Sequence, residues 1–256
     1  MSVLQIHQFP CLSDNYGYLI HNPEHQVTAS IDTPDVGAIE AALSKKGWQL
    51  THILNTHHHF DHAGGNLELK EKTGCQIIGP RAEAEKIPGI DVEVGDGDTV
   101  AFGGVIAKVF DVPGHTAGHV AYWFYNDGIA FVGDTLFALG CGRLFEGTPA
   151  QMWTSLQKLM DMPDDTTIYC AHEYTQANAA FALSVEPGNE ALVARSAEID
   201  RLRAAGKPTV PTTLKLEKET NPFLRPMSQN LQETIGMVGG NLVDVFAETR
   251  RRKDNF

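Results

Sequence analysis

The sequence predicts an α+β domain followed by a small helical one, and three observations support this. Residues 1–32 and 99–132 contain short apolar runs separated by turn residues, which is typical of β-strands. Several of these runs lead directly into a His or Asp side chain. From residue 173 onward the chain is rich in alanine and its apolar residues recur at helical spacing. We therefore predict an α+β domain over 1–173 and a helical domain over 174–256 that closes over it.

Composition limits the classes of protein that remain. The chain has 256 residues, of which 42% are hydrophobic and 20% charged, enough for one large domain or two unequal ones. No apolar run approaches the ~20 residues of a membrane helix, and the N-terminus lacks the pattern of a secretory signal. The net charge of −12 argues against nucleic-acid and anionic-membrane partners. The four cysteines form no CxxC pair, so we expect a cytoplasmic protein. We also predict a monomer.

The N-terminal half shows clear strand and helix signals. Residues 16–20 and 27–31 read as strands on either side of a turn-rich stretch. Residues 35–46 have helical apolar spacing and end at Gly47, and a second helix is expected over about 66–72.

The later segments carry capping and turn signals. Residues 126–128, Asn-Asp-Gly, predict a tight hairpin turn between strands. Thr148, followed by proline and then by glutamine three residues on, predicts a helix start, and Pro163 ends that helix. We expect a break at 187–189 inside the helical region, with Asn189 as a cap, and another break at 239–240.

The densest chemical signal is the stretch Thr-His-His-His-Phe-Asp-His over 56–62. In an extended segment, His57, His59 and Asp61 would share one side, and the glycine turn that follows would bring His62 back to them. Imidazole nitrogens and carboxylate oxygens are ligands for zinc and other first-row metals. The cluster lacks cysteine, which argues against a closed structural zinc site. His58 is expected to point away from this group.

Three further strands end in a candidate ligand. Apolar runs lead to His115, to Asp134 and to His172, as the run before residue 56 leads to the first cluster. Catalytic groups concentrate in loops at the ends of strands. We therefore expect these side chains to converge on one metal centre, with His119 bracing a loop rather than binding metal.

The motif Thr-His-x-His-x-Asp-His resembles the signature of the metallo-β-lactamase superfamily. The resemblance implies an αββα sandwich with a small C-terminal helical domain, and a site for two divalent metal ions. We favour zinc, and iron and manganese stay open because the same ligands accept all three. The resemblance assigns His57, His59 and His115 to the first ion, Asp61, His62 and His172 to the second, and Asp134 to both.

Such a centre predicts hydrolysis. Ions roughly 3.5–4 Å apart lower the pKa of a water between them from about 15.7 toward about 7, so a metal-bridging hydroxide can attack at neutral pH. Asp61 and Asp134 are the carboxylates to which we assign catalytic roles. A thiol of pKa about 8.5 leaves without full protonation, which favours a thioester over an amide substrate.

Four other segments narrow the resemblance. Residues 140–147, 171–175, 220–225 and 250–254 resemble hydroxyacylglutathione hydrolases, the glyoxalase II family, and the likeness spans essentially the whole chain. It implies hydrolysis of S-D-lactoylglutathione, and other S-2-hydroxyacylglutathiones, to glutathione and D-lactate in methylglyoxal degradation. The substrate-binding residues that it implies are Arg143, Phe145, Tyr174, Arg250 and Lys253.

The terminal cations suit this substrate because glutathione carries carboxylates. Arg250 and Lys253 are three residues apart and share a helix face. With Arg143, where the family often has lysine, they are expected to hold the glycine carboxylate, which an arginine can bind bidentately. Phe145 stands where many members have tyrosine, so one hydrogen bond to the peptide is absent.

Three other functions compete with this prediction. A lactonase of the same superfamily would use the same metals. A non-haem iron oxygenase like the persulfide dioxygenases would need a single iron, and the full second ligand set argues against it. A metal-binding protein without catalytic activity is the third, and the complete ligand set argues against that as well.

Overall fold

The computed structural model describes residues 4–256, which form two compact units. Unit 1 contains the chain up to residue 111 together with 117–133, and unit 2 contains 112–116 and 134–256. The whole of the predicted helical domain therefore lies in unit 2, along with residues from before it. The predicted domain boundary at residue 173 stays a prediction.

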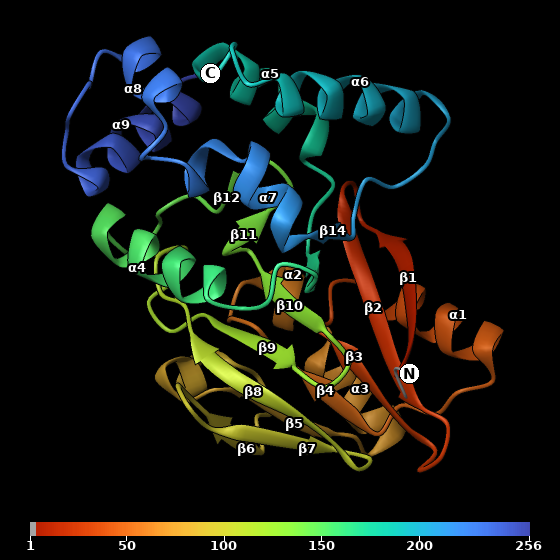
Figure 1. The fold of residues 1–256 in the computed structure, drawn as a ribbon. Helices are drawn as coiled ribbons and strands as arrows, with labels where there is room; N and C mark the ends of the chain where they lie inside the picture. The colour runs from red at the N-terminus through yellow and green to blue at the C-terminus, as the bar shows by residue number, and fades with distance from the viewer. Residues whose placement is uncertain (1–3) are drawn as a thin grey trace. The chain divides into compact units, whose positions relative to one another are not determined.

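The first sheet of unit 1 has six strands in the order β1-β2-β3-β4-β5-β6 (Figure 1). The pairs β1–β2 and β2–β3 are antiparallel, and those from β3 to β6 are parallel. Strand alternation and β-branched residues account for the buried runs in these segments. The strands are β1 Gln5–Cys11, β2 Asn15–Asn22, β3 Val27–Ile31, β4 His52–Leu54, β5 Gln76–Pro80 and β6 Val92–Val94.

The second group of strands in unit 1 runs in the order β10-β9-β8-β7 and is antiparallel. The predicted hairpin around Asn126–Gly128 is confirmed, because this turn joins the antiparallel strands Val120–Phe124 and Ile129–Gly133. Gly128 has φ +67°, the left-handed conformation that glycine adopts readily. The strands are β7 Thr99–Phe102, β8 Val105–Asp111, β9 Val120–Phe124 and β10 Ile129–Gly133.

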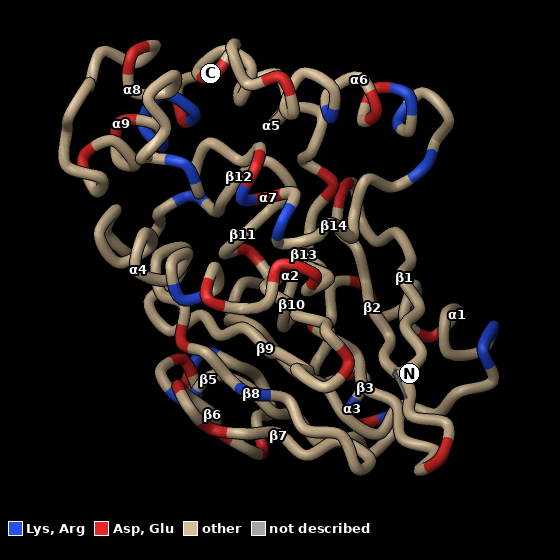
Figure 2. Tube along the Cα trace, in the orientation of Figure 1, with Lys and Arg blue, Asp and Glu red and all other residues tan. Residues whose placement is uncertain are grey.

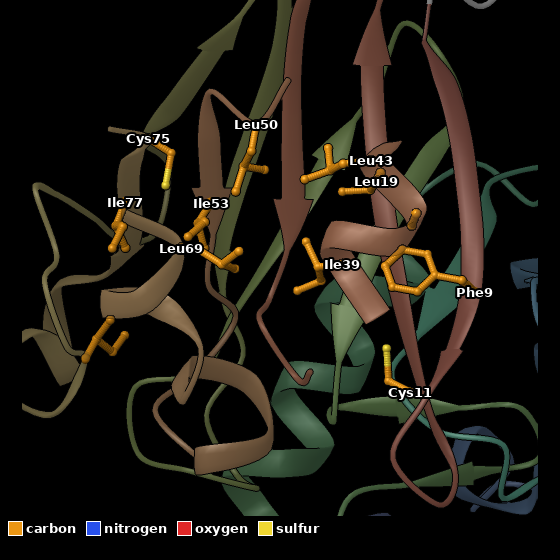
Figure 3. Packing of buried hydrophobic residues seen from close by; sticks show 12 residues of the cluster. Phe9, Cys11, Leu19, Ile39, Leu43, Leu50, Ile53, Leu69, Cys75 and Ile77 are labelled. Carbon is orange, nitrogen blue, oxygen red and sulfur yellow. The ribbon is translucent and has the colours of Figure 1, made fainter. Parts of the chain in front are cut away.

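The two longer helices of unit 1 cover one face of the six-stranded sheet. Ile39 and Leu43 of the first helix join Leu19, Ile53 and other apolar side chains in one buried cluster (Figure 3). The glycines at 47 and 74 cap the predicted helices in the left-handed conformation, as expected. The helices are α1 Val36–Lys46, α2 Phe60–Ala63, α3 Asn66–Thr73 and the 3₁₀ helix η1 Arg81–Lys86.

The two groups of strands in unit 1 pack against each other through their loops and rings. The Tyr122 hydroxyl donates to the Asn55 carbonyl at 2.8 Å, and the Val120 amide donates to the Thr56 carbonyl at 2.9 Å. The rings of Tyr18 and Phe131 lie 5.6 Å apart. These contacts fix the loop that follows β4, which carries the His cluster, against the start of β9.

From residue 174 onward, unit 2 is mostly helical, as predicted for that stretch. The capping box at Thr148 begins α4, and the Asn189 side chain caps α6. The break expected at 239–240 falls between α8 and α9, although α8 already ends at Ile235. Its elements are β11 Leu136–Phe137, β12 Gly140–Cys141, α4 Pro149–Met160, β13 Thr167–Cys170, α5 Thr175–Val185, α6 Glu190–Ala204, β14 Thr212–Thr213, α7 Leu214–Thr220, η2 Pro222–Leu224, α8 Gln229–Ile235 and α9 Leu242–Asp254.

The Asn-Pro-Phe-Leu-Arg stretch holds the short strand pair β11–β12 in place. Asn221 donates from its side-chain amide to the carbonyls of Phe137 and Gly140, at 3.1 and 3.0 Å. The buried carboxylate of Glu217 accepts from the Leu139 amide at 2.9 Å and pairs with Arg195. Buried polar groups that are fully paired make such a network rigid.

Among residues 4–256, no helix combines the length and the apolar character needed to cross a membrane.

Candidate metal centre

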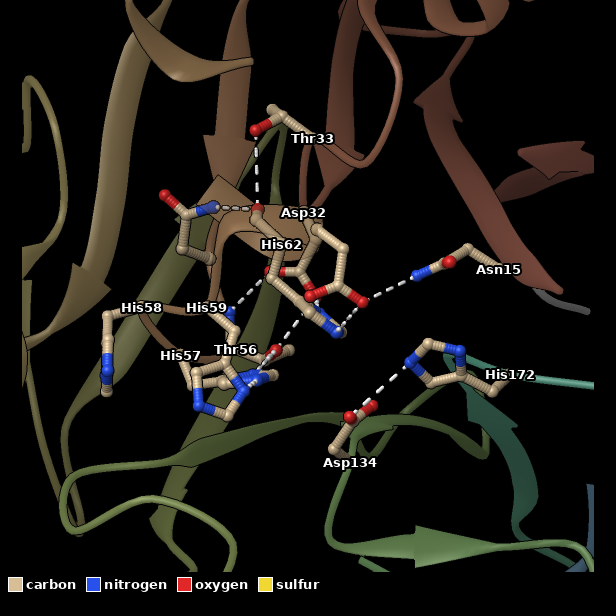
Figure 4. Close-up of polar contacts among 12 residues, drawn as sticks. Asn15, Asp32, Thr33, Thr56, His57, His58, His59, His62, Asp134 and His172 are labelled. Atoms are coloured by element: carbon tan, nitrogen blue, oxygen red, sulfur yellow. Dashed lines mark hydrogen bonds and ion pairs between the residues drawn. The ribbon is translucent and has the colours of Figure 1, made fainter. Parts of the chain in front are cut away.

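The His cluster of unit 1 occupies the loop after β4 and the first turn of α2. His57 is fully buried, and its Nε2 lies 3.0 Å from Nδ1 of His59 (Figure 4). Nε2 of His62 lies 3.5 Å from Oδ2 of Asp61. Imidazole nitrogens and a carboxylate oxygen this close together are donor atoms of the type that metal ions prefer. The residues present therefore fit the metal that the motif implies.

The expected extended geometry is wrong in its second half. The chain enters α2 at Phe60, so Asp61 and His62 lie in a helical turn rather than on an alternating strand. The amides of His62 and Ala63 both donate to the His59 carbonyl at 2.9 Å, which closes this turn. In a strand, the consecutive side chains of Asp61 and His62 would point to opposite faces. In the helical turn, both can serve the same site.

Asp32 orients the cluster and was missed by the sequence analysis. Its carboxylate accepts from the amide and the hydroxyl of Thr56, at 2.7 and 2.8 Å, and contacts Nδ1 of His62 at 2.8 Å. The residue has φ +59°, which aspartate tolerates better than most residues. The contact fixes the His62 ring with Nδ1 toward Asp32 and Nε2 on the side of Asp61. Asp32 directly follows β3, so the strand-end pattern contained the signal.

Replacing Asp32 should weaken metal binding by about 10–100-fold, the usual effect of losing such a supporting group. Asp32→Ala removes the acceptor that holds the His62 ring. Chelator competition, followed by metal analysis of the protein, measures the change. Asp35→Ala is the matched control, since Asp35 caps α1 through the Ala38 amide at 3.0 Å. The control should lose about 1 kcal/mol of stability and no metal. Equal metal affinity in Asp32→Ala and wild type would contradict the assignment.

Glu83 braces the outer side of the same loop. Its buried carboxylate accepts from the His58 amide at 2.9 Å and from the Gly118 amide at 2.8 Å, and it contacts His58 Nδ1 at 2.8 Å. His58 is thus engaged by Glu83, while its ring centre lies 5.0 Å from that of His59. His119 is buried and stacks on His57 with ring centroids 4.6 Å apart, a bracing position. No local pattern links Glu83 to a loop 25 residues earlier.

Unit 2 brings the three remaining ligand candidates together. Oδ2 of Asp134 lies 3.3 Å from Nε2 of His115 and 3.4 Å from Nε2 of His172. Figure 4 shows Asp134 and His172 pointing toward each other. The Arg143 carbonyl lies 2.9 Å from Nδ1 of His115, which fixes that ring with Nε2 toward Asp134. A Cβ at Gly142 would lie 2.0 Å from the Asp134 carbonyl, so only glycine fits there.

Two of the predicted substrate contacts lie beside these ligands. The Phe145 ring is 5.2 Å from the His115 ring and is 63% exposed. Tyr174 stacks on His172, with ring centroids 4.7 Å apart and planes at 3°. Both rings can therefore contact a molecule that reaches the candidate ligands of this unit.

The three predicted cations also lie in unit 2. Arg250 is buried, and its Nη1 donates to the Cys141 carbonyl at 2.9 Å. Nζ of Lys253 donates to the Ala177 carbonyl at 3.2 Å, while the side chain of Arg143 is 66% exposed. An acidic neighbour that the sequence analysis missed, Asp254, contacts both arginines.

Comparison with known proteins places the chain in a family. Residues 29–172 match the model of the metallo-beta-lactamase superfamily, and residues 173–256 match that of the hydroxyacylglutathione hydrolase C-terminus. A hydroxyacylglutathione hydrolase of Maricaulis maris is 58% identical, with 100% of each chain covered. One from Methylococcus capsulatus is 54% identical, with 99% of each covered. The chain belongs to the hydroxyacylglutathione hydrolase family. The predictions of this family and of a hydrolase are thereby confirmed.

Solved structures agree on the fold. The ETHE1 protein of Myxococcus xanthus matches with a TM-score of 0.67 and 24% identity, covering 98% of this chain and 100% of that one. The BLEG-1 B3 metallo-beta-lactamase matches with a TM-score of 0.66 and 20% identity, covering 86% and 100%. The predicted metallo-β-lactamase fold is confirmed, together with the mixed α/β architecture and its helical C-terminal region.

Proposed function

We propose that this enzyme hydrolyses S-D-lactoylglutathione, and other S-2-hydroxyacylglutathiones, to glutathione and the free hydroxy acid. The observation that carries the proposal is in unit 2, where one loop connects a reaction centre to cations. The loop 140–147 contacts His115 through the Arg143 carbonyl and Arg250 through the Cys141 carbonyl. A substrate with a reactive carbonyl at one end and a carboxylate at the other suits this arrangement.

We propose that the chain binds two divalent ions through the ligand set that its motif and its family imply. His57, His59, Asp61 and His62 come from unit 1, and the pairing of Asp134 with two imidazoles in unit 2 supports its role as the shared ligand. Zinc is our first choice, with iron and manganese as alternatives that fit the same donors. When bound, such ions supply Lewis acidity, which activates water and polarises the thioester carbonyl at neutral pH.

The chain's own residues would position the substrate. The glycine carboxylate of glutathione needs local positive charge, because the protein as a whole has a net charge of −12. We assign this charge to Arg143, Arg250 and Lys253. The rings of Phe145 and Tyr174 give apolar contact beside His115 and His172. A thiol of pKa about 8.5 leaves without full protonation, so the proposed substrate does not require a general acid.

The remaining proposals concern organisation. We keep the division into a catalytic domain over 1–173 and a substrate-binding domain over 174–256, which the meeting of the two family models between 172 and 173 supports. We propose a cytoplasmic monomer that acts on this small molecule without nucleic-acid or membrane partners. Four buried free cysteines suit a reducing compartment. Light scattering of the purified protein tests the monomer.

A thioester assay on the metal-loaded protein tests the function. Release of glutathione thiol from S-D-lactoylglutathione is expected, with D-lactate as the second product. Lactone hydrolysis without thiol release would favour a lactonase. Oxygen uptake with glutathione persulfide, and one iron per chain, would favour a dioxygenase.

His172→Ala should remove a ligand of one ion only. We expect metal content to fall from two toward one per chain and kcat to fall with it, since the variant keeps every ligand that the resemblance assigns to the other ion. Metal analysis and circular dichroism measure these together. Loss of both ions, or of neither, in a folded variant would contradict the assignment of His172. His25→Ala is the matched control, because this exposed histidine lies outside the site.

A further inference from the structure

The C-terminal turn of α9 gathers four charged side chains in unit 2: Arg143, Arg250, Lys253 and Asp254. Figure 2 shows the basic residues along this end of α9. Oδ1 of Asp254 lies 2.8 Å from Nη2 of Arg250, and the same atom lies 4.0 Å from Nε of Arg143. One internal carboxylate therefore already contacts two of the cations that the proposed function assigns to a carboxylate of the substrate.

The surroundings make Arg250 a strong carboxylate site. Its side chain is 6% exposed and its guanidinium lies 5.0 Å from the centre of the Phe223 ring. Within the described part of the chain, its buried Nε has no hydrogen-bond partner. A buried guanidinium with an unused donor binds an anion more strongly than an exposed one does.

Lys253 responds to the same charges. Burial lowers the pKa of Lys253, the nearby cations Arg250 and Arg143 lower it further, and Asp254 acts in the opposite direction. Three cations and one carboxylate leave an excess of positive charge in the cluster. A second carboxylate is therefore attracted to it, and Asp254 competes with that carboxylate for the same donors.

We propose that Asp254 is a specificity-determining residue that sets the affinity for the substrate carboxylate by competing for Arg250 and Arg143. The proposal rests on the proposed function, which assigns these cations to glutathione. The side chain of Asp254 is 41% exposed, so it can turn into water when the carboxylate of the ligand arrives. The competition weakens the binding of substrate and of the product glutathione alike.

Asp254→Asn tests the competition because it removes the charge and keeps the shape. We expect KM for S-D-lactoylglutathione to fall about two- to fivefold, the range that corresponds to one partly exposed ion pair. The inhibition constant of glutathione should fall by the same factor. A glutathione analogue with a glycinamide end, which lacks the carboxylate, should bind wild type and variant equally.

Glu248→Gln is the matched control. It removes one negative charge from the same helix, where Glu248 pairs with Arg251 and Arg252 and not with the cluster. KM should stay at its wild-type value in this variant. Asp254→Glu, which restores the charge, should return KM toward wild type.

The sign of the change decides between two roles for Asp254. A rise in KM, or an unchanged KM, in folded Asp254→Asn would overturn the competition; a rise would make Asp254 a clamp that positions Arg250. These results presuppose that the wild-type enzyme cleaves the thioester. Failure of wild type to cleave it would sink the proposed function itself, and the role of Asp254 with it.

Discussion

Asp134→Ala should abolish measurable thioester hydrolysis, because the loss of one group that acts directly in the transition state lowers kcat by about 10²–10³-fold. Asp134 contacts two imidazoles of unit 2, with Oδ2 at 3.3 Å from His115 and 3.4 Å from His172. Alanine leaves both rings without this partner, and it removes the shared ligand of the proposed dinuclear centre. Metal content and turnover, measured on the same sample, check the expectation.

The control for this variant is Asp165→Ala, which removes an exposed carboxylate of the same unit. It should keep both metals and full turnover. If Asp134→Ala retained near-normal turnover with two ions bound, the dinuclear assignment would be wrong. Thermal unfolding of both variants separates this from a general loss of folding.

Removal of both Arg250 and Lys253 should raise KM by about one to two decades per cation, because a hydrogen bond to a charged group contributes roughly 1.5–3 kcal/mol. If these contacts form equally in the ground state and the transition state, kcat changes little. High salt should weaken binding more in wild type than in Arg250→Ala/Lys253→Ala. Kinetics at low and high salt measure both effects.

The structure adds a stability cost to this variant. Arg250 is buried and donates to the Cys141 carbonyl, and Lys253 donates to the Ala177 carbonyl, so the double variant should also unfold at lower temperature. Arg251→Ala/Arg252→Ala is the charge-matched control on the same helix and should keep the wild-type KM. Unchanged KM in Arg250→Ala/Lys253→Ala would mean that both residues only stabilise the C-terminal end of their helix, where basic side chains interact favourably with the helix dipole.

Substitutions of the cations and of Asp254 are expected to change KM in opposite directions, so each variant serves as a check on the other. KM should rise when the cations are removed and fall when Asp254 is neutralised. In the Arg250→Ala/Lys253→Ala background, Asp254→Asn should lose most of its effect, because residues that share partners are not additive.

Local signals in the sequence determined the elements and the identities of the ligand candidates. Gly47, Thr148 and Asn189 each end or begin a helix where predicted, since capping depends on residues within one turn. The His and Asp candidates follow four strands that the structure confirms, because alternation and turn residues mark strand ends within a few positions.

Tertiary structure alone decided how those candidates are supported. Asp32 reaches His62 across 30 residues, Glu83 reaches Gly118 across 35, and Arg250 reaches Cys141 across 109. Such contacts depend on strand order and helix packing, which bring together segments that no local pattern links. The helical turn at Asp61 and His62 replaced the predicted extended run for the same reason, because the tertiary contacts of the His59–Gly65 loop outweigh the local alternation of its residues.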